Sequence, residues 1–275
     1  MFRAKNLLAG VLLGALLTVS SCSDDAAEVS EPLSALVFVI AHPDDEVTFG
    51  PLLGNYAKQG VEVYLVCVTS GQQGTMNTDI PAGDALAAAR EAEITAAAVQ
   101  YGINPPRLLQ LQDGQIDSLS EAEIDDLKTR VRDVFEEVGA QIVITFGPDG
   151  ITGHADHIAV GAITTELVAE MQAEANNERA PEKLYQTMFP ESFGPLLPEG
   201  TDFVLVPDSE ATTIIDASDG IAEAQAAVTE YVTQFPPEMM EQVQLLDMVL
   251  GPRIPLRWIL AKDGQPQSGE TDIFE

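Results

Sequence analysis

All three histidines of this 275-residue chain lie in two short clusters that also contain aspartates. The first cluster is Ala41-His42-Pro43-Asp44-Asp45-Glu46, and the second is Gly153-His154-Ala155-Asp156-His157. Imidazole nitrogens and carboxylate oxygens are common zinc ligands, and a catalytic zinc site uses three protein ligands and keeps one position open. The clustering therefore predicts a metal-dependent site built from both segments.

Each cluster follows an apolar segment that is typical of a buried strand. Residues 35–40 precede the first cluster, and residues 141–146 come shortly before the second. The carboxyl ends of parallel strands lie at one edge of a sheet, where open α/β proteins bind their ligands. We therefore expect the two clusters to meet at that edge.

The spacing within each cluster favours a shared target. A proline followed by three acids suits the first turn of a helix, and this structural role alone would explain residues 43–46 without any catalytic function. In such a helix His42 and Asp45, three residues apart, can face one point, and Asp44 can reach past it to a bound water. The second cluster repeats the spacing, so that His154 and His157 can point into one cleft.

Asp156, between those two histidines, can orient one of the rings by accepting its Nδ1 hydrogen. The alternative for this segment is a solvated loop histidine followed by a helix that Asp156 caps.

The elements that must position the clusters alternate along the chain. We expect strands at 35–41, 61–69, 107–111 and 141–146, and helices at 46–58, 84–101, 120–138 and 156–175. The strands are uninterrupted apolar runs, as in a parallel sheet covered on both faces. This alternation predicts a doubly wound α/β fold.

The last third of the chain is less regular. It contains candidate strands at 183–189, 203–207 and 212–215 and candidate helices at 220–234 and 239–250. We expect residues 35–275 to form one domain in which this last third caps the sheet.

The amino terminus has the features of an export signal. Arg3 and Lys5 precede an apolar run, 7–19, that is too short to span a bilayer comfortably. The run ends in Val19-Ser20-Ser21-Cys22, which resembles a bacterial lipobox. This resemblance implies a lipoprotein signal peptide at 1–21, a lipidated Cys22 with a polar tether over 22–34, and a protein anchored to the cell envelope, periplasmic or at the surface. An ordinary secretory signal is the alternative.

Charge and cysteine content narrow the function further. The chain has 44 acidic and 13 basic residues, a net charge of −31, and such a surface repels nucleic acid. Cys67 lies in an apolar segment and is expected to be a buried core residue.

The two clusters together resemble the signature motifs of the LmbE/PIG-L family of metal-dependent N-acetylglucosaminyl deacetylases, and the similarity extends from Ala35 to about Val168. The resemblance implies a Rossmann-like three-layer fold with a mainly parallel sheet. It also implies zinc, or Fe(II) or another divalent metal, held by His42, Asp45 and His157.

The resemblance also implies separate catalytic roles. Asp44 is the general base, His154 is the protonated partner of the oxyanion and leaving amine, and Arg90 contacts the substrate; we also expect Asp156 among the catalytic residues. Two positions depart from the family pattern: Thr152 stands where relatives often have a tyrosine, and the segment beginning at Tyr231 stands where many have a histidine.

The sequence therefore predicts an exported zinc hydrolase that removes acetyl from an N-acetylated sugar of a glycoconjugate. One alternative is a non-catalytic metal- or glycan-binding lipoprotein, which would not need Asp44. Another is an Fe(II) oxygenase with a facial triad, but those sites usually lie in antiparallel barrels.

Overall fold

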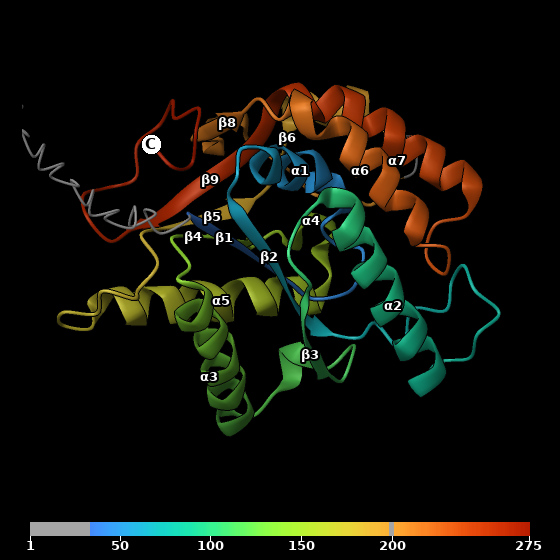
Figure 1. Ribbon diagram of the computed structural model, residues 1–275, viewed down its shortest axis with the longest axis horizontal. Coiled ribbons are helices and arrows are strands. Elements are labelled where there is room, and N and C mark those ends of the chain that lie inside the picture. Colours follow the sequence, from blue (N-terminus) through green and yellow to red (C-terminus); the bar gives the residue numbers. More distant parts are fainter. Residues whose placement is uncertain (1–33, 198–200) are drawn as a thin grey trace, which may run out of the picture. The chain divides into compact units, whose positions relative to one another are not determined.

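The computed structural model describes residues 34–197 and 201–275 (Figure 1). The predicted signal peptide, the lipidated Cys22 and all but the last residue of the tether lie outside the described residues. Within the described part, no helix is both long and apolar enough to cross a bilayer.

A mainly parallel sheet forms the centre of the described fold. In spatial order its strands are β3 (Arg107–Leu111), β2 (Glu62–Thr69), β1 (Ala35–Ile40), β4 (Ile142–Phe146), β5 (Lys183–Thr187), β9 (Ile254–Ala261) and β8 (Thr213–Ile215). The strands from β3 to β5 run parallel, and β9 pairs antiparallel with both β5 and β8. β6 (Phe189–Pro190) and β7 (Leu205–Val206) form a separate parallel pair.

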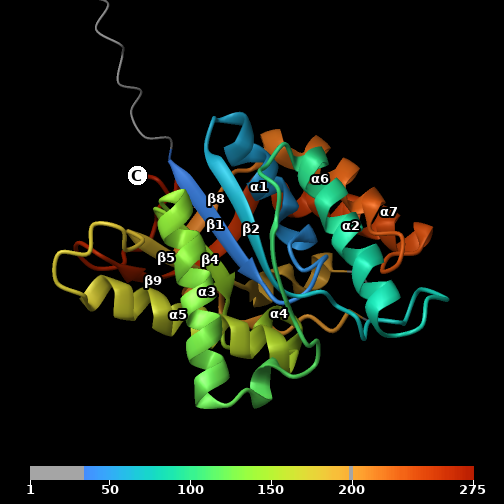
Figure 2. The same ribbon diagram turned by 60° about the horizontal axis from the view of Figure 1, so that its bottom comes forward.

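Helices cover both faces of this sheet. They are α1 (Gly50–Lys58), α2 (Asp84–Tyr101), α3 (Glu121–Val138), α4 (Gly150–Gly153), α5 (Ala155–Ala173), α6 (Ile221–Ala227) and α7 (Pro237–Leu250). Figures 1 and 2 show α3 and α5 on one side and α1, α2 and α6 on the other. The predicted three-layer α/β fold is confirmed. Every residue of β1 is buried, as expected for a strand covered on both faces.

Local signals set several of the boundaries. α3 begins with a capping box, in which the side chains of Ser120 and Glu123 satisfy free backbone N–H groups of the first turn. The same helix ends at Gly139, whose φ of 67° belongs to the left-handed region that glycine adopts most readily. Cys67 is fully buried in β2, as predicted.

Other boundaries differ from the predictions. Residues 43–46 form a turn followed by a 3₁₀ segment, so α1 begins at Gly50 rather than at residue 46. The predicted strand 183–189 divides after Thr187, and the predicted helix 220–234 is α-helical only to Ala227. The last third packs α6 against α1 and α2, and α7 against α6. It also adds β9, a strand that was not predicted and that contains an unfavourable proline, Pro255.

The strand order creates the place for a site. The chain proceeds from β1 to β2 on one side and from β4 to β5 on the other, while β1 and β4 are themselves neighbours. The carboxyl ends of two such strands flank a crevice, the usual ligand position of open α/β sheets. Both histidine clusters follow these two strands.

Candidate active site and metal centre

The two predicted clusters meet, and three side chains bring their ligand atoms to one point. His42 Nδ1 lies 3.2 Å from His157 Nε2 and 3.4 Å from an Asp45 carboxylate oxygen. His157 Nε2 lies 3.0 Å from the other oxygen of Asp45. Ligands bound tetrahedrally to zinc at about 2.0–2.1 Å lie about 3.3 Å apart, so these separations suit a zinc ion.

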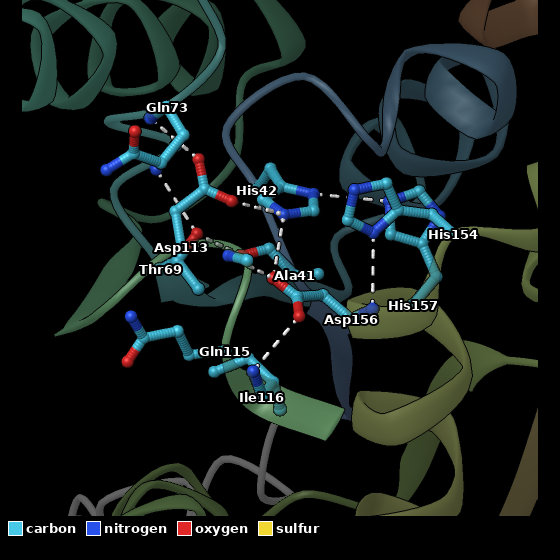
Figure 3. A network of polar contacts seen from close by, with 12 residues as sticks. Ala41, His42, Thr69, Gln73, Asp113, Gln115, Ile116, His154, Asp156 and His157 are labelled. Atoms are coloured by element: carbon cyan, nitrogen blue, oxygen red, sulfur yellow. Dashed lines mark hydrogen bonds and ion pairs between the residues drawn. The ribbon is translucent and has the colours of Figure 1, made fainter. Parts of the chain in front are cut away.

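Hydrogen bonds on the far side of each ring determine which nitrogen is free. His157 Nδ1 lies 2.9 Å from the Gly150 carbonyl, to which it donates, so its Nε2 keeps a lone pair in the neutral ring. His42 Nε2 lies 3.1 Å from Asp113 and 3.3 Å from Asp156, between two carboxylates (Figure 3). In the neutral ring that nitrogen therefore carries the hydrogen, which leaves the Nδ1 lone pair facing the shared point.

Two lone pairs and a carboxylate facing one point require a positive charge between them. Although burial opposes it, the carboxylates of Asp45, Asp113 and Asp156 raise the pKa of His42 well above its usual value. Burial favours the neutral form of Asp45 as well, yet the two imidazoles hold the pKa of its carboxyl well below the usual range. This N₂O donor set fits a divalent cation such as zinc, with carboxylates and a carbonyl orienting the ligating rings.

The neighbouring side chains offer two further ligand combinations within the described residues. One is His42 with His154 and His157, and the other is His42 with Asp113 and Asp156. The second uses the face of His42 that already donates to those carboxylates. The predicted set differs from both in that it includes Asp45, whose two carboxylate oxygens lie 3.4 Å from His42 Nδ1 and 3.0 Å from His157 Nε2.

Asp45 reaches the site through a turn rather than a helix, so the helical interpretation of residues 43–46 was wrong. One oxygen of Asp45 accepts hydrogen bonds from the backbone N–H groups of Ala41, at 3.1 Å, and His42, at 2.7 Å. Asp44 has a φ of 116°, which no helix contains. The carboxylate that was expected to face the helix dipole instead folds back on the end of β1, and the turn bends around it.

The buried Arg90 pairs with the partly buried Asp44 beside the ligands. Arg90 Nη2 lies 3.0 Å from Asp44 Oδ2, and the guanidinium also donates to the carbonyls of Pro43, at 2.5 Å, and Gly71, at 2.8 Å. Burial raises the pKa of Asp44 to about 6, while the charge of Arg90 opposes the rise. Arg90 thus holds the strained turn and also lines the cavity beside Asp44. A Cβ at Gly71 or Gly74 would overlap its guanidinium.

His154 and Asp156 occupy positions that differ in detail from the predictions. His154, not Asp156, caps α5, because its Nδ1 accepts from the Asp156 N–H at 3.2 Å. Asp156 is buried and accepts from the backbone N–H groups of Gly114 and Ile116 at 2.7 and 3.0 Å. It orients His42 through Nε2, so the expected contact to the Nδ1 of a neighbouring ring was wrong.

The sequence alone assigned no role to two partners of the metal-facing rings. Asp113 contacts His42 Nε2 through one carboxylate oxygen, and its other oxygen accepts a hydrogen bond from the Gln73 N–H at 2.9 Å (Figure 3). The Gly150 carbonyl orients His157. A signal for Asp113 exists, because Asp113-Gly114 follows strand β3 at the same sheet edge; no sequence signal marks a backbone carbonyl.

The two departures from the family pattern lie in different surroundings. Tyr231 is buried and donates to a Glu46 oxygen at 2.5 Å, and Tyr101 contacts the same oxygen at 3.3 Å. Burial raises the pKa of Glu46 to about 7, although the hydrogen bond from Tyr231 opposes this. Thr152 lines a cavity that also touches Asp44 and His157.

The chain is similar in sequence to known proteins over most of its length. The PIG-L family, described as GlcNAc-PI de-N-acetylase, matches residues 37–168. A 1D-myo-inositol 2-acetamido-2-deoxy-alpha-D-glucopyranoside deacetylase of Rhodococcus erythropolis is 33% identical over 239 residues, which span 72% of this chain and 80% of the relative. A protein of the same description from Catenulispora acidiphila is 31% identical over 246 residues, 74% of this chain and 81% of the relative.

Solved structures share the fold at lower sequence identity. N,N'-diacetylchitobiose deacetylase from Pyrococcus horikoshii superposes with a TM-score of 0.61 at 19% identity, over 82% of this chain and 84% of its own. The 4-carboxy-2-hydroxymuconate hydratase GalB from Pseudomonas putida superposes with a TM-score of 0.62 at 18% identity, over 85% of this chain and 99% of its own. The second of these shows that the fold alone does not define the reaction.

The family match includes both histidine clusters, and the two curated relatives match about four-fifths of their own length to this chain. This chain therefore belongs to the PIG-L (LmbE-like) family of de-N-acetylases and is an enzyme that acts on an acetylated amide.

Proposed function

We propose that the protein is a zinc-dependent hydrolase that removes the acetyl group from an N-acetylglucosamine-type glycoconjugate. The observation that carries the proposal is the convergence of His42 Nδ1, His157 Nε2 and the Asp45 carboxylate within 3.0–3.4 Å of one another. Both free nitrogens are fixed by hydrogen bonds on the far side of their rings. The substrate class is supported by the names of the relatives.

A divalent ion held by these residues would polarise the amide carbonyl and lower the pKa of a bound water. The side chains beside it divide the proton transfers. Asp44, with a pKa of about 6, is ionised at neutral pH and can take a proton from the attacking water. The protonated Asp44 can then deliver that proton to the leaving nitrogen as the C–N bond breaks, which gives a free amine and acetic acid; the acid ionises to acetate at neutral pH.

His154 acts as a hydrogen-bond donor in this scheme. Its Nδ1 accepts from the Asp156 N–H, so in the neutral ring Nε2 carries the hydrogen. Burial and the charges of His42 and His157 lower the pKa of His154, which favours this neutral form over the protonated form that the resemblance implied. A neutral donor can still stabilise the developing oxyanion.

The test measures acetate release from a panel of N-acetylglucosamine conjugates, including an inositol conjugate and an N-acetylated disaccharide. We expect release that a chelator abolishes and zinc restores. Asp44→Asn should keep the metal and lower the rate by at least ~10²-fold, the scale of general-base loss. Asp125→Asn on the exposed face of α3 is the matched control and should retain full activity. Loss of metal from Asp44→Asn would contradict the ligand assignment.

We further propose that the protein is exported and anchored to the bacterial cell envelope through a lipidated Cys22. The support is the basic, apolar and lipobox-like order of residues 1–22. In a bacterial host, the wild-type protein should partition with membranes and carry an N-terminal acylated cysteine by mass spectrometry. Cys22→Ser should abolish the acylation; an unmodified, uncleaved amino terminus in the wild type would refute the proposal.

A further inference from the structure

Two cavities of different chemistry adjoin Asp44. The polar cavity, of about 320 Å³, is lined by His42, His154, Arg90, Asp113 and Gln73. The apolar cavity, of about 270 Å³, has Asp45 and His157 in its wall. The metal-facing triad therefore lies between the two, with Asp44 lining both.

Apolar side chains from distant segments build the second cavity. They are Val47 after β1, Phe146 at the end of β4, Ile151 in α4, the loop residues Phe203 and Phe235, and three residues of α7, Met239, Val243 and Leu246. Asp44, Asp45 and His157 are its charged or titratable lining residues within the described part of the chain. The wall also contains Thr48, Thr152, Thr201 and Gln242, but most of its surface is apolar, which suits an apolar group better than a hydroxyl-rich sugar ring.

An acetyl group does not use this space. A cavity of about 15 Å³ already accommodates one water-sized group, which is about the size of a methyl. The apolar cavity, at about 270 Å³, is many times larger. Its size and lining suit a flexible apolar chain or a ring rather than a single methyl.

The positions of the two histidines orient the substrate amide. His154, the proposed donor to the oxyanion, lines the polar cavity, and His157 lines the apolar one. With the carbonyl carbon at the triad, the sugar on the nitrogen side lies among the polar residues. The substituent on the other side of the carbonyl then enters the apolar cavity.

We propose that this cavity is an acyl pocket and that the enzyme hydrolyses N-acyl amino sugars whose acyl chain is several carbons long, in preference to N-acetyl sugars. The proposal rests on the proposed amidohydrolase function. α7 supports it, because Met239, Val243 and Leu246 follow a one-face helical spacing and all line the cavity. Leu245, between them, is 64% exposed and lies outside the lining.

The experiment compares kcat/KM for the methyl glycosides of N-acetyl-, N-butyryl- and N-hexanoylglucosamine. Each buried methylene should raise kcat/KM about fourfold, so the hexanoyl substrate, with four more methylenes, should exceed the acetyl substrate by about 10²-fold. Val243→Trp fills the cavity and should reduce the hexanoyl-to-acetyl ratio to about one. The control Leu245→Trp adds the same ring on the outside and should leave the ratio unchanged.

A second series tests the other apolar group that a substrate can carry. This series compares kcat/KM for methyl and octyl N-acetylglucosaminide. The acyl proposal is overturned if kcat/KM rises with the length of the aglycone but not with the length of the acyl chain, and if Val243→Trp removes the rise with aglycone length. In that case the cavity takes the aglycone. Equal kcat/KM across the acyl series also overturns the acyl proposal.

Binding separates this proposal from the proposed function. Calorimetry on the zinc-loaded Asp44→Asn variant should give at least tenfold tighter binding of the hexanoyl than of the acetyl glycoside. Adding Val243→Trp to this variant should remove the difference in affinity. This readout needs no turnover. If no substrate is hydrolysed but the difference persists, the hydrolase proposal fails and the acyl pocket stands; equal affinities refute the pocket.

Discussion

Replacement of Arg257 by methionine should damage both the stability and the metal site of this protein. Arg257 lies on β9, and its buried guanidinium pairs with Asp149, contacts Glu210 at 2.9 Å and donates to the Thr187 carbonyl at 3.0 Å. Asp149 in turn accepts from the Ile151 N–H at 3.0 Å. Methionine keeps an apolar stem of similar length and removes the charge.

The loop that Arg257 supports is strained. Ile151 has a φ of 64°, which is a true outlier for a β-branched residue, and it persists only where its surroundings hold it. Gly150, directly before it, supplies the carbonyl that orients His157. A loss of Arg257 therefore reaches a metal-facing imidazole through the loop.

The magnitude follows from the burial of the pair. Arg257 and Asp149 expose only 7% and 5% of their side chains, and removing one partner of such a buried pair costs about 3–5 kcal/mol. In a domain of this size each kcal/mol shifts Tm by about 2–4 °C, so we expect a fall of roughly 6–20 °C. Disturbing an outer partner of a ligating histidine weakens metal binding by about 10–100-fold.

Thermal unfolding by circular dichroism and competition with a zinc chelator measure the two effects. The control is Arg132→Met, which removes an arginine that pairs with Glu136 and Glu174 at 2.8 and 2.6 Å but is 34% exposed. Solvent screens such pairs, so the control should move Tm by less than about 2 °C. Equal Tm shifts in both variants, or unchanged zinc affinity in Arg257→Met, would refute the reasoning.

Two further substitutions test the turn beside Asp44 and the buried acid of α7. Gly71→Ala places a Cβ on the Arg90 guanidinium and should lower kcat/KM at least tenfold, because displaced groups beside the reacting atoms lose orientation. Gly139→Ala, with a similar φ of 67° and nothing within 4 Å, should cost about 1 kcal/mol of stability and leave kcat/KM unchanged. Burial raises the pKa of Asp247 from 3.8 to about 8, so the folded state holds this proton more tightly and stability falls as pH rises from about 4 to about 8. Asp247→Asn should therefore stabilise the protein by up to about 4 kcal/mol at pH 7 and not at pH 4, measured by urea unfolding; equal gains at both pH values would contradict the assignment.

Much of the fold could be predicted because its signals are local. The helix 84–101 and the strand 107–111 have the predicted bounds, since an Ala-rich run and a short apolar run each specify one element. The meeting of the two histidine clusters was predictable too, because strand ends share one sheet edge.

The parts that failed depend on partners far away in the chain. The acids after Pro43 match a helix start, but Asp45 satisfies two N–H groups at the end of β1 and imposes a turn. Strand β9 exists because β5 and β8 pair with it on either side, and its own sequence contains a proline. The contact of Arg257 with Asp149 requires that pairing register, which no local pattern encodes.

The position of β9 has a consequence for the order in which the chain matures. It lies between β5 and β8, although it is synthesised after both, and it carries the arginine that supports the loop before His157. A nascent chain that ends before Ile254 contains every histidine but neither this strand nor this arginine. Until β9 joins the sheet, the loop before His157 lacks the support of Arg257, so a chain without residues 254–261 should bind the metal more weakly than the complete fold.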